Sequence, residues 1–70
     1  MLKPNQTLGK NIAHYRKERK LSQAKLSAIV GMDLNHLYCI EAGRKYPSIN
    51  LIVRLAVALG VSIEELAEKR

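Results

Sequence analysis

Aromatic residues and cysteines are scarce in this 70-residue sequence. It contains three tyrosines but no phenylalanine or tryptophan, and Cys39 is its only cysteine. A single cysteine excludes an intramolecular disulfide. No stretch approaches the roughly 18 uninterrupted apolar residues that indicate a membrane-spanning helix. We therefore expect a small, mostly aliphatic core that no disulfide stabilises.

Patterns typical of enzymes and metalloproteins are also missing. The sequence offers no paired inward carboxylates, no nucleophile with a recognisable base and no glycine-rich phosphate loop. All four glycines are interpreted as turns or helix ends. His36 and Cys39 lie close in sequence, but a metal site needs three or four ligands. We expect no enzymatic activity, no metal and no cofactor.

The length predicts a single domain. Residues 1–6 (MLKPNQ) contain a proline and no periodicity, so we expect a flexible arm followed by one domain over residues 7–70. Lys3 and Pro4 interrupt the N-terminus and no apolar run follows, which predicts no signal peptide and a cytoplasmic location. A core of this size supplies about 3–5 kcal/mol of net stability. Dimerisation is therefore expected to contribute to stability.

The positive charge lies in one part of the chain. Residues 1–45 hold nine Lys and Arg against three acidic residues, whereas residues 46–70 hold three of each. The whole net charge of +6 therefore belongs to residues 1–45. A one-sided positive field favours a polyanionic partner, and the alternative is a solvated basic surface that aids solubility.

The stretch from Ser22 to Gly43 has the pattern of two short helices joined by a tight turn. Ser22 is a good N-cap for the first helix. Three apolar residues, Leu26, Ile29 and Val30, follow at spacings that place them on one helical face. Gly31 stands where the helix must stop, because glycine adopts positive φ without steric cost.

The second helix of this stretch is predicted over residues 33–42. Asp33 is its N-cap, Leu37 and Ile40 face inward, and Gly43 closes it. Two helices joined by so short a turn cross at a steep angle. The N-terminal part of the second helix is then presented outward, which is the geometry that enters a DNA major groove.

The segment LSQAKLSAIVGMDLNHLYCIEAGRKYPS resembles the helix-turn-helix of Cro and phage-repressor (XRE-type) DNA-binding domains. The later segment LAVALGVSIEEL is similar to the closing part of those domains, so the resemblance spans about residues 8 to 67. It implies an all-α, five-helix, lambda-repressor-like fold, with the helix-turn-helix at helices 2 and 3. It also implies that Arg16 pairs with Glu41, against the alternative of two solvated side chains.

The outward residues of the second motif helix are the candidates for reading bases. The amide of Asn35 can pair bidentately with adenine, against the alternative of a plain surface residue. Leu34 packs on a thymine methyl or belongs to a protein interface. Tyr38 reaches a phosphate or covers the core edge, and Cys39 lies at the groove edge or is semi-buried. The base candidates are Asp33, Leu34, Asn35, Tyr38 and Cys39.

A second group of residues is expected to contact phosphates. Gln23 lies in the first turn of its helix, where free N–H groups and the helix dipole favour a phosphate. Arg44 and Lys45 sit in the loop after the recognition helix, where the resemblance implies phosphate anchoring. Lys25 and His36 complete this group, and solvated side chains are the alternative.

The remaining helices are predicted from caps and apolar spacing. Thr7 is expected to cap a first helix over residues 8–20, with Leu8, Ile12 and Tyr15 inward and Lys10, Asn11, Lys17 and Glu18 toward water. Ser48 caps a fourth helix over residues 49–59, whose core stripe is predicted as Ile49, Ile52, Leu55, Ala56 and Leu59. Gly60 ends that helix. Ser62 and Glu65 have the spacing of a capping box that begins a short fifth helix, anchored by Leu66.

The fourth helix has more apolar residues than one face requires. The resembled family more often has polar residues at Leu51 and Val57, so the surplus indicates a partner surface. The candidates for a homodimer interface are Leu51, Val57 and Ile63, although single exposed apolar residues are also common.

Two functions of different classes follow from these patterns. The first is a double-stranded DNA-binding transcriptional regulator that acts as a homodimer on a palindromic operator, like Cro or a restriction–modification controller protein. The second is a protein-binding module of the same fold, such as an antitoxin that holds a toxin. The apolar residues Leu34, Leu51 and Val57 motivate the second hypothesis.

Overall fold

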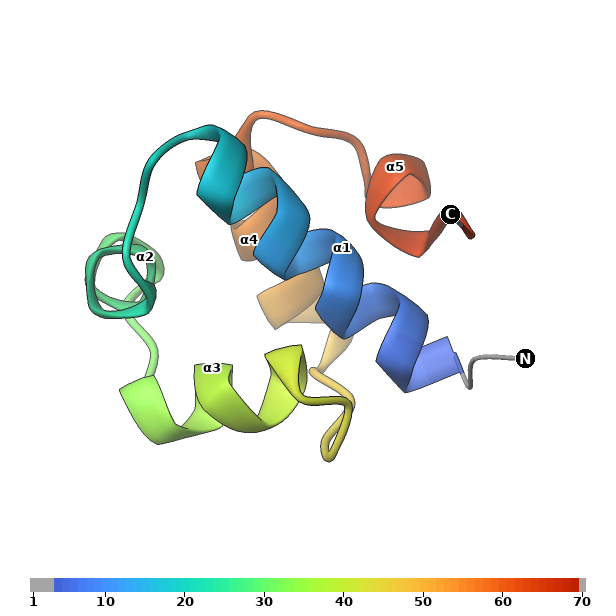
Figure 1. The fold of residues 1–70 in the computed structure, drawn as a ribbon, viewed down its shortest axis with the longest axis horizontal. Coiled ribbons are helices and arrows are strands. Elements are labelled where there is room, and N and C mark those ends of the chain that lie inside the picture. Colours follow the sequence, from blue (N-terminus) through green and yellow to red (C-terminus); the bar gives the residue numbers. More distant parts are fainter. Residues whose placement is uncertain (1–3, 70) are drawn as a thin grey trace.

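Five α-helices account for most of residues 4–69, the part of the chain that this computed structural model describes (Figure 1). They are α1 (Pro4–Glu18), α2 (Gln23–Val30), α3 (Leu34–Glu41), α4 (Ile49–Leu59) and α5 (Ile63–Ala67). Within these residues there is no β-strand. The predicted all-α, five-helix architecture is confirmed.

Helix α1 runs through the middle of the fold and contacts α3, α4 and α5 (Figure 1). Helix α2 packs against α3 and α4, and α5 rests on α1 and α4. Because α3 is held by both α1 and α2, two elements position it from different sides. The described chain extends over 31 × 22 × 21 Å.

The core between the helices is almost entirely aliphatic, as the composition predicts. Leu8, Ile12 and Tyr15 of α1 point inward as expected. Leu26, Leu37, Ile40, Leu55, Leu59 and Leu66 are fully enclosed. These residues come from all five helices, so no helix completes its apolar contacts without the others.

Local capping explains where four of the helices begin. The hydroxyls of Ser22, Ser48 and Ser62 each accept a hydrogen bond from a first-turn backbone N–H, and the Asp33 carboxylate does the same. The capping box of α5 is complete, since Glu65 accepts from the Ser62 N–H at 2.9 Å. Four of the five predicted N-caps are therefore confirmed.

The beginning of the first helix was predicted wrongly. Helix α1 starts at Pro4, four residues before the predicted Leu8, and Thr7 is buried inside it and does not cap it. Proline is favoured in a first helical turn, because its fixed φ suits the helix and its missing N–H would have no partner there. Residues 4–6 of the predicted arm are therefore helical. Residues 1–3 of the arm lie outside the described residues.

Several residues face the opposite way from the prediction. Asn11, expected in water, is buried with 1% of its surface exposed. Ile49, expected in the core, is 64% exposed. Ile29, predicted on one helical face with Leu26 and Val30, is 54% exposed, whereas those two residues are buried. Leu51, expected at a dimer interface, is buried. The α4 sequence is apolar on both sides, so only the packing of α4 against α1, α2 and α5 decides which side faces inward.

Candidate nucleic-acid interface

Helices α2 and α3 form a two-helix unit whose connection is set by short-range chemistry. Gly31 ends α2 with φ at 79°, and its N–H donates to the Ser27 carbonyl at 2.8 Å. The Asp33 carboxylate then accepts from the His36 N–H at 3.3 Å and starts α3. Only three residues separate the two helices. Asp33, a predicted base contact, thus already has a structural role as the N-cap.

Helix α3 divides into an inner and an outer face. Leu37 and Ile40 are fully buried, as predicted. Leu34, Asn35 and Tyr38 are exposed on the other side. The base candidates that begin α3 thus lie on its free surface, where an incoming ligand can reach their side chains.

Two predicted site residues of α3 are only partly accessible. The side chains of His36 and Cys39 are each half-buried. The carbonyl of Cys39 accepts hydrogen bonds from the N–H groups of Arg44 and Lys45, at 2.8 Å and 3.4 Å. These bonds tie the loop that follows α3 to its last turn and fix where that loop begins.

The inner end of α3 is locked by a hydrogen-bonded network of charged and polar side chains. Arg16 of α1 donates two hydrogen bonds to the Glu41 carboxylate, from Nε to Oε2 at 2.8 Å and from Nη2 to Oε1 at 3.1 Å. The Arg16 and Glu41 side chains are only 11% and 7% exposed. Forked pairing of this kind is geometrically specific. The Arg16–Glu41 pair that the resemblance implied is therefore present.

The same network reaches further than predicted. The third guanidinium nitrogen of Arg16, Nη1, donates to the Leu21 carbonyl at 2.8 Å. Gln23, at the start of α2, donates its amide to Glu41 Oε1 at 2.9 Å. One carboxylate therefore joins α1, α2 and α3. The Gln23 amide nitrogen, predicted to face a phosphate, is turned inward toward Glu41 in this structure.

The cations predicted to anchor phosphates are accessible. Lys25 on α2 and Arg44 and Lys45 after α3 are all exposed. Because Arg16 neutralises Glu41 internally, the exposed acidic charge between residues 22 and 45 comes from Asp33 alone. The surface of the two-helix unit is therefore positive on balance.

Two contacts that sequence reasoning missed position α3 and α5 against α1. Gly9, which was expected at a turn or helix end, lies inside α1 against the main chain of Ile40 and Glu41. Asn11 holds the end of α5 through bonds to the Leu66 and Glu68 carbonyls at 2.8 and 2.6 Å. A glycine inside an otherwise helical pattern costs stability relative to alanine. The presence of Gly9 within a helical pattern could therefore have indicated that another backbone approaches α1 closely at this position.

No group of three or more His, Cys, Asp and Glu side chains within residues 4–69 lies close enough to hold a metal ion. In that range no helix has both the length and the apolar character needed to cross a bilayer.

A match to a known family model identifies the family of this chain. A family model described as Helix-turn-helix (HTH_3) matches residues 12–66, which is most of the chain. The chain belongs to this helix-turn-helix family. The family is one of DNA-binding transcriptional regulators, and the XRE-type resemblance of the sequence is confirmed.

Relatives within the helix-turn-helix family include regulators and repressors. The chain is 39% identical over 59 residues to an uncharacterised HTH-type transcriptional regulator, y4dJ, of Sinorhizobium fredii, covering 84% of this chain and 77% of that protein. It is 35% identical over 60 residues to the immunity repressor protein of Bacillus phage phi105, covering 86% of this chain but 42% of the repressor. The chain thus spans less than half of that phage protein.

Solved helix-turn-helix structures have the same fold. The restriction-modification controller protein C.AhdI from Aeromonas hydrophila superimposes with a TM-score of 0.84, with 29% identity over 89% of this chain and 94% of that one. The hypothetical transcription factor NHTF from Neisseria superimposes with a TM-score of 0.91, with 25% identity over 96% of this chain and 77% of that one.

Proposed function

We propose that this helix-turn-helix protein is a cytoplasmic, sequence-specific regulator of transcription that binds double-stranded DNA as a homodimer. The observation that carries the proposal is the split character of α3. Its first residues, Leu34 and Asn35, are exposed, while its last residue, Glu41, is clamped to α1 and α2. A rigidly held helix with a free outer face can enter a major groove without rearranging the domain.

Asn35 is the side chain that we expect to distinguish bases. Its amide can donate to adenine N7 and accept from adenine N6 at the same time. Leu34, beside it, offers an apolar surface for the methyl group of thymine. Together they favour an A·T pair followed or preceded by a thymine in each half-site.

Arg44 and Lys45 are expected to anchor the protein to the sugar–phosphate backbone. Both are exposed, and the hydrogen bonds of their N–H groups to Cys39 tie them to the end of α3. Phosphate contacts of this kind set the register of a recognition helix and carry no sequence information themselves. Lys25 on α2 and the hydroxyl of Tyr38 are further candidates.

A dimer would read two half-sites related by a two-fold axis. The two α3 helices then enter successive major grooves, with centres separated by roughly 34–36 Å, one turn of B-DNA. This spacing predicts a palindromic operator.

Selection from a random duplex library tests the proposal. The full chain is incubated with the library at about 150 mM salt, where non-specific binding is weak. An enriched palindrome is the expected result. The same selection with Asn35→Ala is the matched control, and it is expected to lose the preference at one base pair per half-site. A folded protein that enriches no sequence would contradict the proposal.

A second candidate function is capture of a protein partner, as an antitoxin does with its toxin. The observation that favours it is exposed apolar surface, because Val57 is 76% and Leu34 is 38% exposed. The double variant Asn35→Ala/Lys45→Ala separates the two functions. Loss of DNA binding while binding of a protein partner is retained would support the DNA-binding function of these residues.

A further inference from the structure

Helix α4 has two apolar faces, and the core covers only one of them. Its inner face contributes Leu51, Ile52, Leu55, Ala56 and Leu59 to the core. On its outer face Ile49, Val53 and Val57 follow one another at intervals of four residues, with 64%, 41% and 76% of their surface exposed. Residues four apart form a ridge along a helix. We call these three residues the α4 stripe.

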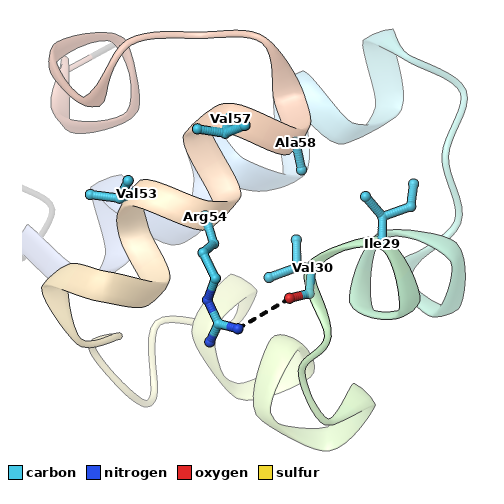
Figure 2. A pocket seen from close by; sticks show the side chains of 6 residues that line it. All are labelled: Ile29, Val30, Val53, Arg54, Val57 and Ala58. Atoms are coloured by element: carbon cyan, nitrogen blue, oxygen red, sulfur yellow. Dashed lines mark hydrogen bonds between the residues drawn. The ribbon is translucent and has the colours of Figure 1, made fainter.

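A groove runs beside the α4 stripe, between α4 and α2. It has a volume of about 290 Å³ and is lined by Ile29, Val30, Val53, Arg54, Val57 and Ala58. Figure 2 shows Ile29 on the α2 side of this groove, with Val53 and Val57 on α4 pointing away from Arg54. Because Ile29 is itself 54% exposed, the apolar surface continues from α4 across the groove onto α2.

One charged residue, Arg54, is exposed beside the α4 stripe and lines the groove. Arg54 is the only charged residue in the sequence of α4, and its Nη1 donates to the Val30 carbonyl at 3.3 Å (Figure 2). This hydrogen bond holds the Arg54 guanidinium toward α2, on the groove side. The three residues of the stripe are themselves aliphatic, and Val53 and Val57 point away from Arg54. An apolar patch of this kind on a small domain is typical of a protein interface.

The position of the α4 stripe in the chain favours a second copy over other occupants. The net charge of +6 lies in residues 1–45, while residues 46–70 are balanced. Two copies repel each other wherever their basic segments face, so they can approach most closely through the balanced segment, which contains the stripe. An interface there also leaves the basic surface of α3 and its following loop free.

The shape of the surface suits a two-fold contact as well. In a two-fold interface the same patch lies on both partners and has to complement itself. Here a ridge, the α4 stripe, lies next to a groove on the same surface, so the ridge of one copy can enter the groove of the other. Packing of i±4 ridges between two helices favours a crossing angle of roughly −50°.

We propose that the α4 stripe binds a second copy of this chain, with Val53 next to the two-fold axis. Val53 is the middle residue of the stripe and also lines the groove. It therefore lies at the boundary between ridge and groove, where the two-fold axis passes when each ridge enters the groove of the other copy. The proposal rests on the proposed dimeric function and names its interface. It replaces the predicted candidate Leu51, which is buried, and it retains Val57.

Charge substitution at Val53 tests both the surface and the axis. Sedimentation equilibrium of the full chain is expected to show a monomer–dimer equilibrium. Val53→Glu and Val53→Lys are each expected to weaken dimerisation at least about tenfold, a loss of about 1.4 kcal/mol. Each places like charges opposite each other across the axis. An equimolar mixture of the two variants is expected to recover the dimer, because opposite charges then face each other.

The controls separate this effect from misfolding and from net charge. Val53 is partly exposed, so the circular dichroism and unfolding midpoint of each variant check that the fold survives. Lys17→Glu lowers the net charge more than Val53→Glu does, but on an exposed position of α1. It is expected to leave dimerisation unweakened.

Three outcomes would overturn the proposal. They are a wild-type chain that stays monomeric, Val53 variants that dimerise like the wild type, and a mixture that does not recover the dimer. In the first case a different protein is the occupant of the α4 stripe. Binding of Val53→Glu to a single half-site duplex is measured alongside. If this variant still binds the half-site, DNA binding stands even where the proposed interface is wrong. If the chain dimerises through the α4 stripe but selects no DNA sequence, the interface stands and only the proposed function is contradicted.

Discussion

Gly9 of α1 packs directly against the carbonyl oxygen of Ile40, near the end of α3. A Cβ atom at Gly9 would overlap that oxygen and lie 2.9 Å from the Glu41 carbonyl oxygen. Because both neighbours are main-chain atoms of α3, they cannot move aside without moving the helix. Together with the Arg16–Glu41 pair, this contact determines how closely α3 approaches α1.

Gly9→Ala is expected to destabilise the protein although it improves helix propensity. In an open helix this change would stabilise by about 1 kcal/mol. Overpacking against the main chain of α3 is expected to reverse the sign and cost about 1–3 kcal/mol. Urea unfolding measures the change. A variant as stable as the wild type would mean that α1 and α3 do not approach as closely as described.

Glu41→Ala is expected to be the most damaging single change in the network. It leaves the Arg16 guanidinium poorly solvated and without its carboxylate, and breaking such a pair costs about 3–5 kcal/mol. That loss is comparable with the whole stability expected of a core this small, about 3–5 kcal/mol. Circular dichroism at room temperature should therefore show a largely unfolded chain.

The double variant Arg16→Met/Glu41→Leu provides the comparison for that experiment. Replacing both partners with apolar residues removes the uncompensated charge, so the double variant is expected to be more stable than Glu41→Ala alone. If Glu41→Ala is as stable as the double variant, the unpaired Arg16 guanidinium does not destabilise the fold, and this explanation is wrong.

Asn11→Leu is expected to loosen α5 selectively. The change removes the amide that donates to the Leu66 and Glu68 carbonyls, and leaving buried acceptors unpaired costs about 1–3 kcal/mol. Hydrogen exchange is expected to become faster at the backbone amides of α5 than at those of α3. Ser62→Ala is the matched variant, because it weakens α5 at its other end by about 0.5–2 kcal/mol. Uniform acceleration in all helices would contradict a local role for Asn11.

Arg44→Ala and Lys45→Ala are expected to weaken binding to every DNA sequence and to reduce its salt dependence. Each lost phosphate contact on B-DNA lowers the slope of log K against log salt by about 0.9. Affinities measured over a series of salt concentrations give this slope. Lys69→Ala removes the same charge near the C-terminus and serves as the control. An unchanged slope in the first two variants would contradict their anchoring role.

Most of the fold was predictable because its signals are local. Ser22, Ser48 and Ser62 act as caps within their own first turn, and Gly31 and Gly60 end helices by their own positive φ. These effects need no contact beyond a few residues. The family pattern added the Arg16–Glu41 pair, which joins residues 25 positions apart.

The candidate site was predictable only in part. The exposure of Leu34 and Asn35 follows from the inward direction of Leu37 and Ile40, so helical spacing alone predicts it. The direction of the Gln23 amide does not follow, because it depends on the position of Glu41 on another helix. A first-turn glutamine has equal access to a phosphate and to a neighbouring carboxylate until the helices are packed.

The sequence by itself determined that there are five helices, the N-caps of the last four, the family and the location of the positive charge, because each of these depends on residue type and short-range spacing. Only the tertiary structure decided that Gly9 is a contact point, that Asn11 is buried, and that Ile49 faces outward while Leu51 faces inward. The physical reason is that α4 is apolar around most of its circumference. The rotation of α4 about its axis is set by packing against α1, α2 and α5, and no local pattern in the α4 sequence predicts it.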